Sequence, residues 1–449
     1  MQSPMLHHKG KLVDGCETPG ERRADGVAPA HPNGIQLSRD VFLLLVSTLD
    51  FRGVDDSKGI VGQLRRGGFD GPVIRELSLV RCELDWDLFG DGELYVRQVG
   101  HPSAFGVPKG AVCGGGTPAH ANTFVLLWRC SARKISPDGV LYWNSEPVEV
   151  RMASQHVCWR QFRLNDAGDD LEYLTEPEPL RWKGAGDCGP HRSLPGRSLN
   201  QTFVQPVPYT PAADQWVVCN HFIDTSTLAV LRFAFNGATG LYEWAEISKE
   251  FGKGYFEASV LPWKSDWVIV ARSLTGEDRA VSDPPLHGWV RVNDLFSDGI
   301  VLRDFPEPGS FRAPIAAYAC PDGAVRWISG NKSRSPHGLG RNPLYLFEAD
   351  VENGFRTKTV QTVFDAVAAK LPIQPNPIVD MGKLLPHSGG REQILVHRVR
   401  TVALRQAEAD LGAPAKVLQS GDFASTAMYY ATLDYGTDMP ATWDFPAQP

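Results

Sequence analysis

Apolar segments of four to six residues, separated by polar or glycine-containing turns, run along most of the chain. These segments are rich in β-branched and aromatic residues, which strands favour. The clearest are residues 41–46, 59–64, 123–128, 215–218, 228–233, 324–328, 344–347 and 393–397. Turn dipeptides typical of hairpins occur at Asp138-Gly139, Asn236-Gly237, Asp322-Gly323 and Asn353-Gly354. The pattern predicts successive strands joined by tight turns.

Helical periodicity is scarce, and only residues 363–371 and 402–410 are predicted to form short helices. No long linker divides the chain. We therefore predict an all-β protein in which residues 1–33 form a poorly ordered or extended N-terminal segment and residues 34–449 form one domain. Radial repetition lets a long antiparallel chain avoid open sheet edges, so this domain is predicted to be a six-bladed β-propeller, with seven blades as the alternative.

One predicted hairpin carries an acid and a base. The apolar segments 256–260 and 267–272 flank the polar turn Lys264-Ser265-Asp266, with Glu257 early in the first and Arg272 at the end of the second. The hairpin therefore brings the carboxylate and the guanidinium close together at one end. A buried carboxylate at the mouth of a sheet is a candidate nucleophile or base, and a cross-strand ion pair is the structural alternative.

Composition narrows the classes of partner. The formal net charge of -7 argues against nucleic acid, because nothing offsets phosphate repulsion. No apolar run approaches the ~18 residues needed to span a bilayer. Residues 1–33 lack the apolar core of a secretory signal, so the chain is predicted to be cytoplasmic, or secreted or periplasmic after removal of a signal peptide.

The eight cysteines lie at positions 16, 82, 113, 130, 158, 188, 219 and 320. They form no Cys-x-x-Cys pair and show no Cys/His spacing typical of zinc sites. In a chain of this length the pattern predicts free, mostly buried thiols and no disulfide framework. Neither a metal nor a cofactor is predicted.

Several motifs resemble the sialidase-like superfamily of β-propellers, which includes exo-acting arabinanases. Glu257 and Arg272 resemble the glutamate that opens a hairpin strand in that family and the arginine of its substrate-carboxylate triad. Gly340-Arg341-Asn342-Pro343 is similar to a segment with a later family arginine. Arg52, followed by Asp55 and Asp56, is similar to the first blade, where the family keeps an arginine and an acid/base aspartate. The resemblance implies a carbohydrate-active hydrolase.

The chain departs from the family pattern at two places. An Arg-x-Pro motif is replaced by His31-Pro32-Asn33-Gly34, and the segment expected to hold a nucleophilic tyrosine, residues 377–386, contains Asp380 and no tyrosine. The first change removes a guanidinium from the carboxylate clamp, and the second puts a negative charge where a sialic acid carboxylate would lie. We therefore predict a substrate other than a sialoside.

Histidines and arginines beside turns or within apolar segments complete the candidate substrate-binding residues. His101, His120, His337 and His387 lie next to proline, alanine or glycine at predicted strand ends. Arg160 and His221 lie within apolar surroundings, a pattern suited to the recognition of sugar hydroxyls. Caps and strand-end hydrogen bonds are the structural alternative for all six.

Three functions stay open. The favoured one is exo-acting glycoside hydrolysis by paired carboxylates. Asp55 or Asp56 would protonate the leaving oxygen, Glu257 or Asp380 would act as nucleophile or as base for water, and Arg272 and Arg341, together with Arg52, would hold the sugar. The second is a polysaccharide lyase in which His101 or His120 abstracts a proton from a uronate. The third is a non-catalytic propeller that binds a glycan or a protein. The predicted partner is a small molecule or an oligosaccharide, with no nucleic acid or membrane.

Overall fold

The computed structural model describes thirteen segments of the chain. They are residues 4–13, 28–49, 57–107, 123–134, 155–183, 205–210, 214–222, 225–273, 287–306, 313–338, 341–371, 376–402 and 423–441. Every regular element in these segments is a strand. Within them no helix is long and apolar enough to cross a membrane.

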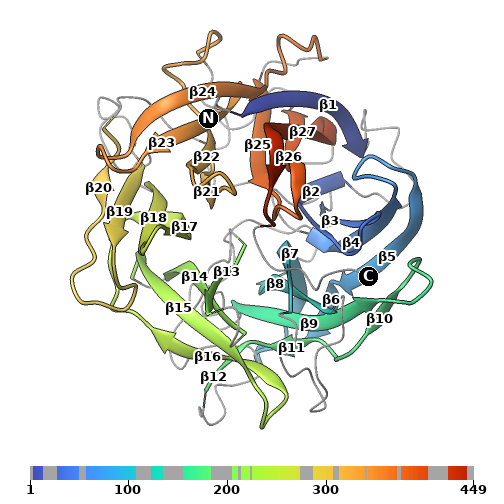
Figure 1. Ribbon diagram of the computed structural model, residues 1–449. Coiled ribbons are helices and arrows are strands. Elements are labelled where there is room, and N and C mark those ends of the chain that lie inside the picture. Colours follow the sequence, from blue (N-terminus) through green and yellow to red (C-terminus); the bar gives the residue numbers. More distant parts are fainter. Residues whose placement is uncertain are drawn as a thin grey trace, which may run out of the picture.

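The described strands form six sheets set around a common centre (Figure 1). The first sheet runs in the order β2 (Ala28–Gln36), β3 (Val41–Leu49), β4 (Ser57–Arg66) and β5 (Val73–Arg81). The second runs in the order β6 (Glu83–Trp86), β7 (Leu94–Gly106), β8 (Thr123–Lys134), β9 (His156–Leu164) and β10 (Leu171–Tyr173), with β11 (Glu178–Pro179) also paired to β9. The third runs in the order β13 (Val207–Thr210), β14 (Gln215–Phe222), β15 (Thr227–Asn236), β16 (Leu241–Ile247) and β12 (Arg181–Trp182).

The remaining three sheets have four strands each. The fourth contains β17 (Tyr255–Trp263), β18 (Asp266–Ser273), β19 (Gly288–Val292) and β20 (Arg303–Asp304). The fifth contains β21 (Ala316–Ala319), β22 (Val325–Gly330), β23 (Leu344–Asp350) and β24 (Arg356–Phe364). The last contains β25 (Asn376–Leu384), β26 (Gly390–Val402), β27 (Phe423–Met439) and β1 (Met5–Val13).

Apolar side chains fill the space between each sheet and both of its neighbours. In β3, Leu43 and Leu45 pack against the second sheet, whereas Leu44 and Val46 pack against the last. Successive side chains of a strand point to opposite faces, so an uninterrupted apolar run is what a strand buried on both faces requires. Comparable clusters join the other neighbouring sheets and close the ring.

The N-terminal strand β1 completes the last sheet by pairing with β27, and Figure 1 shows it on the rim beside β24. The side-chain amide of Gln361 on β24 also holds β1. It accepts a hydrogen bond from the Leu6 N–H at 2.8 Å and donates one to the Pro4 carbonyl at 2.9 Å. The boundary predicted at residue 33 falls inside β2, and the segment before it supplies β1.

The all-β propeller prediction is confirmed. Each apolar segment singled out in the sequence lies in a strand, except that Ala324 precedes β22. The helix predicted at residues 363–371 is wrong. There β24 continues through Phe364, and the Asp365 carboxylate then accepts the N–H groups of Val367 and Ala368, which stabilises a turn. Of the second predicted helix, only Val402 at the end of β26 is described.

We expect Gln361→Ala to lower the free energy of unfolding by about 1–2 kcal/mol, because two hydrogen bonds between β24 and the β1 segment are lost. The exposed neighbour Thr362 is the control, and Thr362→Ala should change it by less than about 0.5 kcal/mol. Equilibrium urea unfolding of the full chain measures both. Equal effects would show that Gln361 does not hold β1.

Candidate active site

Strands on the central side of four sheets share one irregularity. β2, β7, β17 and β25 each contain a β-bulge, at Ala30/Asn33, Gly100/Ser103, Phe256/Ser259 and Asp380/Lys383. One residue in each bulge has a positive φ, namely His31 (40°), His101 (53°), Glu257 (48°) and Met381 (55°). Such strain in non-glycine residues persists only where the surroundings impose it, and it concentrates at functional sites.

The strand next to each bulge places a polar residue opposite the residue that precedes the bulge. The pairs are Ala30 with Ser47, Gly100 with Arg129, Phe256 with Arg272, and Asp380 with Arg398. Three arginines thus occupy corresponding positions in three sheets. The fold itself gathers guanidinium groups at the level of the bulges.

His31 and His101 contact each other across the first and second sheets. Their ring centroids lie 3.8 Å apart, and the Nδ1 of His31 lies 2.9 Å from the Ser47 hydroxyl oxygen. The Nε2 of His31 is buried without a hydrogen-bond partner among the described residues. The two bulges are joined further by a 2.8 Å hydrogen bond from the Asn33 side-chain amide to the Pro102 carbonyl.

Both imidazoles are neutral at neutral pH. Burial lowers the pKa of His31 well below its ordinary value, and the charges of Arg398, Lys383 and Arg129 lower it further. Burial likewise lowers the pKa of His101, helped by the same cationic groups and by His31. A neutral imidazole has a ring nitrogen that can accept a proton from a substrate, and its lowered pKa makes it a weak base.

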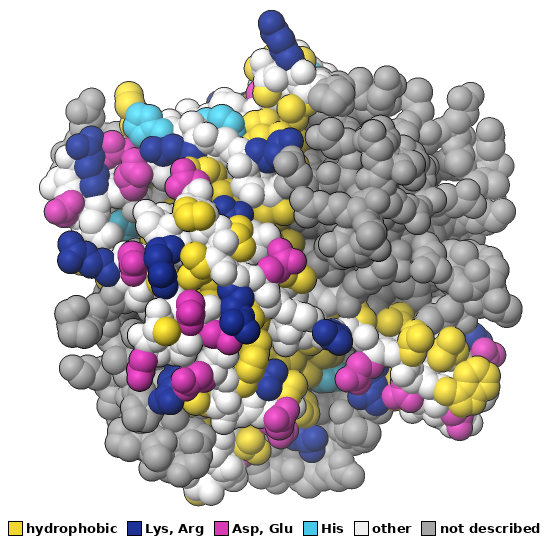
Figure 2. Space-filling view, turned by 90° about the vertical axis from the view of Figure 1, so that its right-hand side faces the viewer, with side chains coloured by type: hydrophobic (Ala, Val, Ile, Leu, Met, Phe, Trp, Pro, Cys, Tyr) yellow, Lys and Arg dark blue, Asp and Glu magenta, His cyan; other side chains and the backbone are white. Residues whose placement is uncertain are grey.

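Lys383, Arg129 and Arg398 form a buried cationic cluster around these histidines, with exposed fractions of 4%, 9% and 0%. Burial lowers the pKa of Lys383 to about 8. The cluster stands out in a protein of net charge -7. On the side of the molecule shown in Figure 2, by contrast, basic and acidic side chains are interspersed.

Asp380 is fully buried and is held by two arginines. Its Oδ1 accepts the Arg398 Nε at 2.9 Å, and its Oδ2 accepts the Arg341 Nη1 at 3.0 Å. Arg398 is fully buried, whereas 29% of the Arg341 side chain is exposed. With both oxygens occupied, Asp380 is arranged to orient Arg341 toward solvent, and it is poorly placed to attack a sugar itself.

Glu257 and Arg272 lie close together across the β17–β18 hairpin, as predicted, and form the ion pair given as the structural alternative, with 2.8 Å between Oε2 and Nη1. Both side chains keep some exposure, 11% for Glu257 and 16% for Arg272. The Arg272 guanidinium also lies over the Phe256 ring, 4.7 Å from its centroid. Stacking and pairing fix the arginine, which in turn orients a carboxylate that solvent can still reach.

Two further histidines lie near this pair. The His221 ring centroid, at the end of β14, is 6.3 Å from that of Phe256. His287, just before β19, is buried, and burial followed by the Arg272 charge lowers its pKa well below the ordinary value. The surroundings of Glu257 are therefore rich in imidazole.

A separate cavity of ≈ 270 Å³ lies further along the same strands. Leu261, Tyr318 and Leu384 line it, together with prolines and alanines. Leu261 lies four residues after Glu257, and Leu384 lies four residues after Asp380. Four strand residues correspond to about 13 Å, so the cavity is separate from these two carboxylates. Among the described residues, the lining includes no acid or imidazole.

The comparisons with known proteins bear on the fold. No protein-family model and no curated protein matches the chain. The sialidase of Trypanosoma rangeli in complex with sialic acid matches with a TM-score of 0.50 and 9% identity, over 96% of this chain and 58% of that chain. The chain has a sialidase-like β-propeller fold. It spans a little over half the length of that sialidase chain.

Two other solved structures have similar coverage. The α-L-arabinofuranosidase of Fusarium graminearum with arabinobiose has a TM-score of 0.49 and 10% identity, over 96% of this chain and 98% of that one. A protein of unknown function from Dyadobacter fermentans has a TM-score of 0.47 and 12% identity, over 94% and 98%. All these identities are low, so the likeness concerns the fold.

Within this sialidase-like propeller, the predicted site residues have different positions. Glu257, Arg272, Asp380, Arg341, His101 and His221 lie at or beside the bulged ends described above. Arg52, Asp55, Asp56 and His120 lie outside the described residues.

Three predicted residues lie elsewhere. Arg160 on β9 packs over the Tyr173 ring and donates to the Thr175 carbonyl at 2.8 Å. His337 lies 3.1 Å from the Asp365 carboxylate, and His387 Nδ1 lies 3.0 Å from the Pro440 carbonyl. For these three residues the structural alternative describes the observed contacts.

Sequence reasoning missed His31, Lys383, Arg129, Arg398 and His287. Two signals could have found most of them. His-Pro occurs at both 31–32 and 101–102, the two bulges that meet. An arginine also ends three apolar strand segments, in Leu-Leu-Trp-Arg129, Val-Ile-Val-Ala-Arg272 and Leu-Val-His-Arg398.

We expect Asp380→Asn to lower the free energy of unfolding by about 3–5 kcal/mol, because it leaves the buried Arg398 charge uncompensated. The matched change Arg341→Gln should cost no more than about 1 kcal/mol, because that side chain is partly exposed. Urea unfolding of both variants gives the comparison. Similar losses would contradict the structural role assigned to Asp380.

The neutral histidine pair predicts a loss of stability in acid. A folded-state pKa below the ordinary 6.5 means that only the unfolded chain takes up protons as the pH falls below 6.5. Each such histidine then lowers the free energy of unfolding by about 1.4 kcal/mol per pH unit, until the pH reaches the pKa of that histidine in the folded protein. Unfolding free energies measured from pH 7.5 to 5 should fall less steeply in His101→Asn, in which asparagine also tolerates the positive φ. Parallel profiles for the variant and the parent chain would refute the assignment.

Proposed function

We propose that this sialidase-like propeller is a glycoside hydrolase whose substrate binds at the bulged end of the central strands. The observation that carries the proposal is Glu257, a carboxylate at a strained φ of 48°, fixed by Arg272 at 2.8 Å and still reached by solvent. Local strain and a fixed charged partner are features of catalytic carboxylates. We also infer that the six sheets are the six blades of the propeller.

In the proposed mechanism Glu257 acts as the nucleophile or as the base for water, and Asp55 or Asp56 supplies the proton to the leaving oxygen. The strands that flank residues 50–56 support this pairing. Leu49 and Ser57 pair with each other, and Leu49 also pairs with Ala28 at the His31 end of β2. The chain therefore leaves and re-enters the first sheet on the side that carries the bulge.

Arg341 and Arg272 are proposed to hold the sugar, with the Glu257–Arg272 and Asp380–Arg341 pairs facing one pocket. Asp380 would act as a positioning residue for Arg341. The cationic cluster of Lys383, Arg129 and Arg398 favours a glycan with an acidic group.

The substrate is proposed to be other than a sialoside. Because two arginines neutralise Asp380, its charge adds little repulsion, and the argument rests on His31. Its imidazole is neutral and stands where the family motif would place an arginine, so one charge-assisted hydrogen bond to a sialic acid carboxylate, worth roughly 1.5–3 kcal/mol, is missing.

A polysaccharide lyase is the second candidate. The observation that favours it is the neutral His101 beside the cationic cluster. His101 would take a proton from a uronate, and the cluster would neutralise the uronate carboxylate. The products separate the two reactions. A lyase product absorbs near-ultraviolet light through its new double bond, and a hydrolase product does not.

We expect one of a panel of fluorogenic glucuronides, arabinosides and rhamnosides to be hydrolysed faster than a sialoside, with no unsaturated product. Glu257→Gln should lower kcat by about 10²–10⁴-fold, because the amide cannot act as base or nucleophile. Steady-state kinetics and product absorbance are the measurements.

The matched control is Glu348→Gln, since Glu348 also pairs with an arginine across two strands, Arg326 at 2.7 Å, but on β23, outside the bulged strands. Folded Glu348→Gln protein should keep its kcat. Efficient turnover of the sialoside that disappears in Glu257→Gln would refute the substrate class. Intact glycans throughout, with binding retained, would indicate a non-catalytic propeller.

A further inference from the structure

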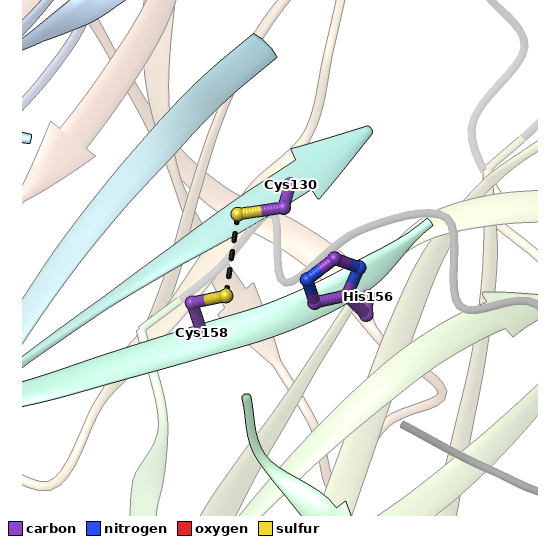
Figure 3. Close-up of side chains that lie close together, drawn as sticks. All are labelled: Cys130, His156 and Cys158. Carbon is purple, nitrogen blue, oxygen red and sulfur yellow. Dashed lines mark hydrogen bonds between the residues drawn. The ribbon is translucent and has the colours of Figure 1, made fainter. Parts of the chain in front are cut away.

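Three soft or borderline donor groups meet on one face of the second sheet. Cys130 on β8 pairs directly with His156 on β9, and Cys158 lies two residues further along β9 (Figure 3). Residues two apart on a strand share a face, so both sulfurs and the imidazole project to the same side. The two Sγ atoms are 3.3 Å apart, and a donor atom of each residue lies within 4.8 Å of the other two.

The cluster opens onto a cavity of ≈ 480 Å³ between the first and second sheets. Leu79 and Arg81 of β5 line one side of it, and Glu176 and Pro179 of the segment that covers β9 line another. Cys158 is buried, whereas Cys130 and His156 are partly exposed to this space. A ligand could therefore reach the three donor atoms without unfolding of the sheet.

We propose that Cys130, Cys158 and His156 bind one zinc ion, with the fourth coordination position open to the cavity. Two thiolates and an imidazole form a donor set that selects zinc over magnesium or calcium, which prefer oxygen. Three protein ligands and an open position are the arrangement of accessible zinc sites. Binding displaces the thiol protons of both cysteines to solvent as the two Zn–S bonds form.

The distances fit this ion after small movements. Tetrahedral zinc, with bonds of about 2.3 Å to sulfur and about 2.0 Å to nitrogen, holds its ligand atoms about 3.5–3.8 Å apart. The sulfurs must separate by about half an ångström, and a rotation of the His156 side chain brings in the nitrogen. A disulfide would instead require the sulfurs to approach to about 2.05 Å across a diagonal of the sheet.

Metal binding is tested on the full chain, purified under reducing conditions. We expect one equivalent of Zn²⁺ per chain, and Co²⁺ in its place should give thiolate-to-cobalt charge-transfer bands and tetrahedral d–d bands. Cys130→Ala, Cys158→Ala and His156→Ala should each weaken zinc binding by more than about 100-fold. Cys219→Ala is the matched control, because Cys219 is buried, as Cys158 is, but belongs to no such cluster among the described residues. This variant should bind zinc like the parent chain.

A measurement without substitutions covers the case in which a variant does not fold. Zn²⁺ should protect Cys130 and Cys158 from alkylation by iodoacetamide, as mapped by mass spectrometry, whereas Mg²⁺ should not. The proposal is overturned if no cobalt charge-transfer band forms, if zinc leaves both thiols reactive, or if the Cys130→Ala variant binds the metal as tightly as Cys219→Ala does.

Discussion

The burial of each sheet on both faces is the constraint from which the rest of the structure follows. In β3 the successive residues Leu43 and Leu44 pack against different neighbouring sheets. Clusters of the same kind occur between every two adjacent sheets. A sheet that is apolar on both sides needs two partners, and a ring supplies them without leaving any sheet uncovered.

In four of the strands nearest the centre, β-bulges interrupt the regular pairing. Bulges at His31, His101, Glu257 and Met381 turn side chains out of the alternation, at the cost of a positive φ in each case. The strain is tolerated because well-packed strands hold the flanking residues on both sides. The apolar clusters therefore stabilise the strands that carry the strained bulges. Local departures from regular structure of this kind are expected at functional sites.

Local features were within reach of the sequence. The strands follow from short apolar runs. The proximity of Glu257 and Arg272 follows from the short polar turn Lys264-Ser265-Asp266, because hairpin register is set by neighbours in the chain. His31 and His101, which are in contact, are 70 residues apart in the sequence, and the hydrogen-bonded Arg341 and Asp380 are 39 residues apart. No local pattern encodes such contacts, so neither could be predicted from the sequence. The pattern of residues 363–371 predicts a helix, but the Asp365 carboxylate accepts a hydrogen bond from the Val367 N–H and stabilises a turn.

The cysteines illustrate the same limit. Cys130 and Cys158 are 28 residues apart, a spacing unlike that of any zinc motif, and they meet only because β8 and β9 are antiparallel neighbours in one register. A shift of that register by one residue would turn Cys158 to the opposite face of the sheet. The identity of the residues was available from the sequence, whereas their proximity depends on strand pairing.

The pairing of β1 with β27 has a consequence for how the protein is made. Leu6 and Gln361 are 355 residues apart, and the partner strand of β1 lies later still, at residues 423–439. A ribosome that adds about 5–20 residues per second needs on the order of twenty to eighty seconds to travel from one strand to the other. During that time β1 has no partner in the last sheet. The pairing of β1 with β27 can therefore form only after all the strands between them have been synthesised.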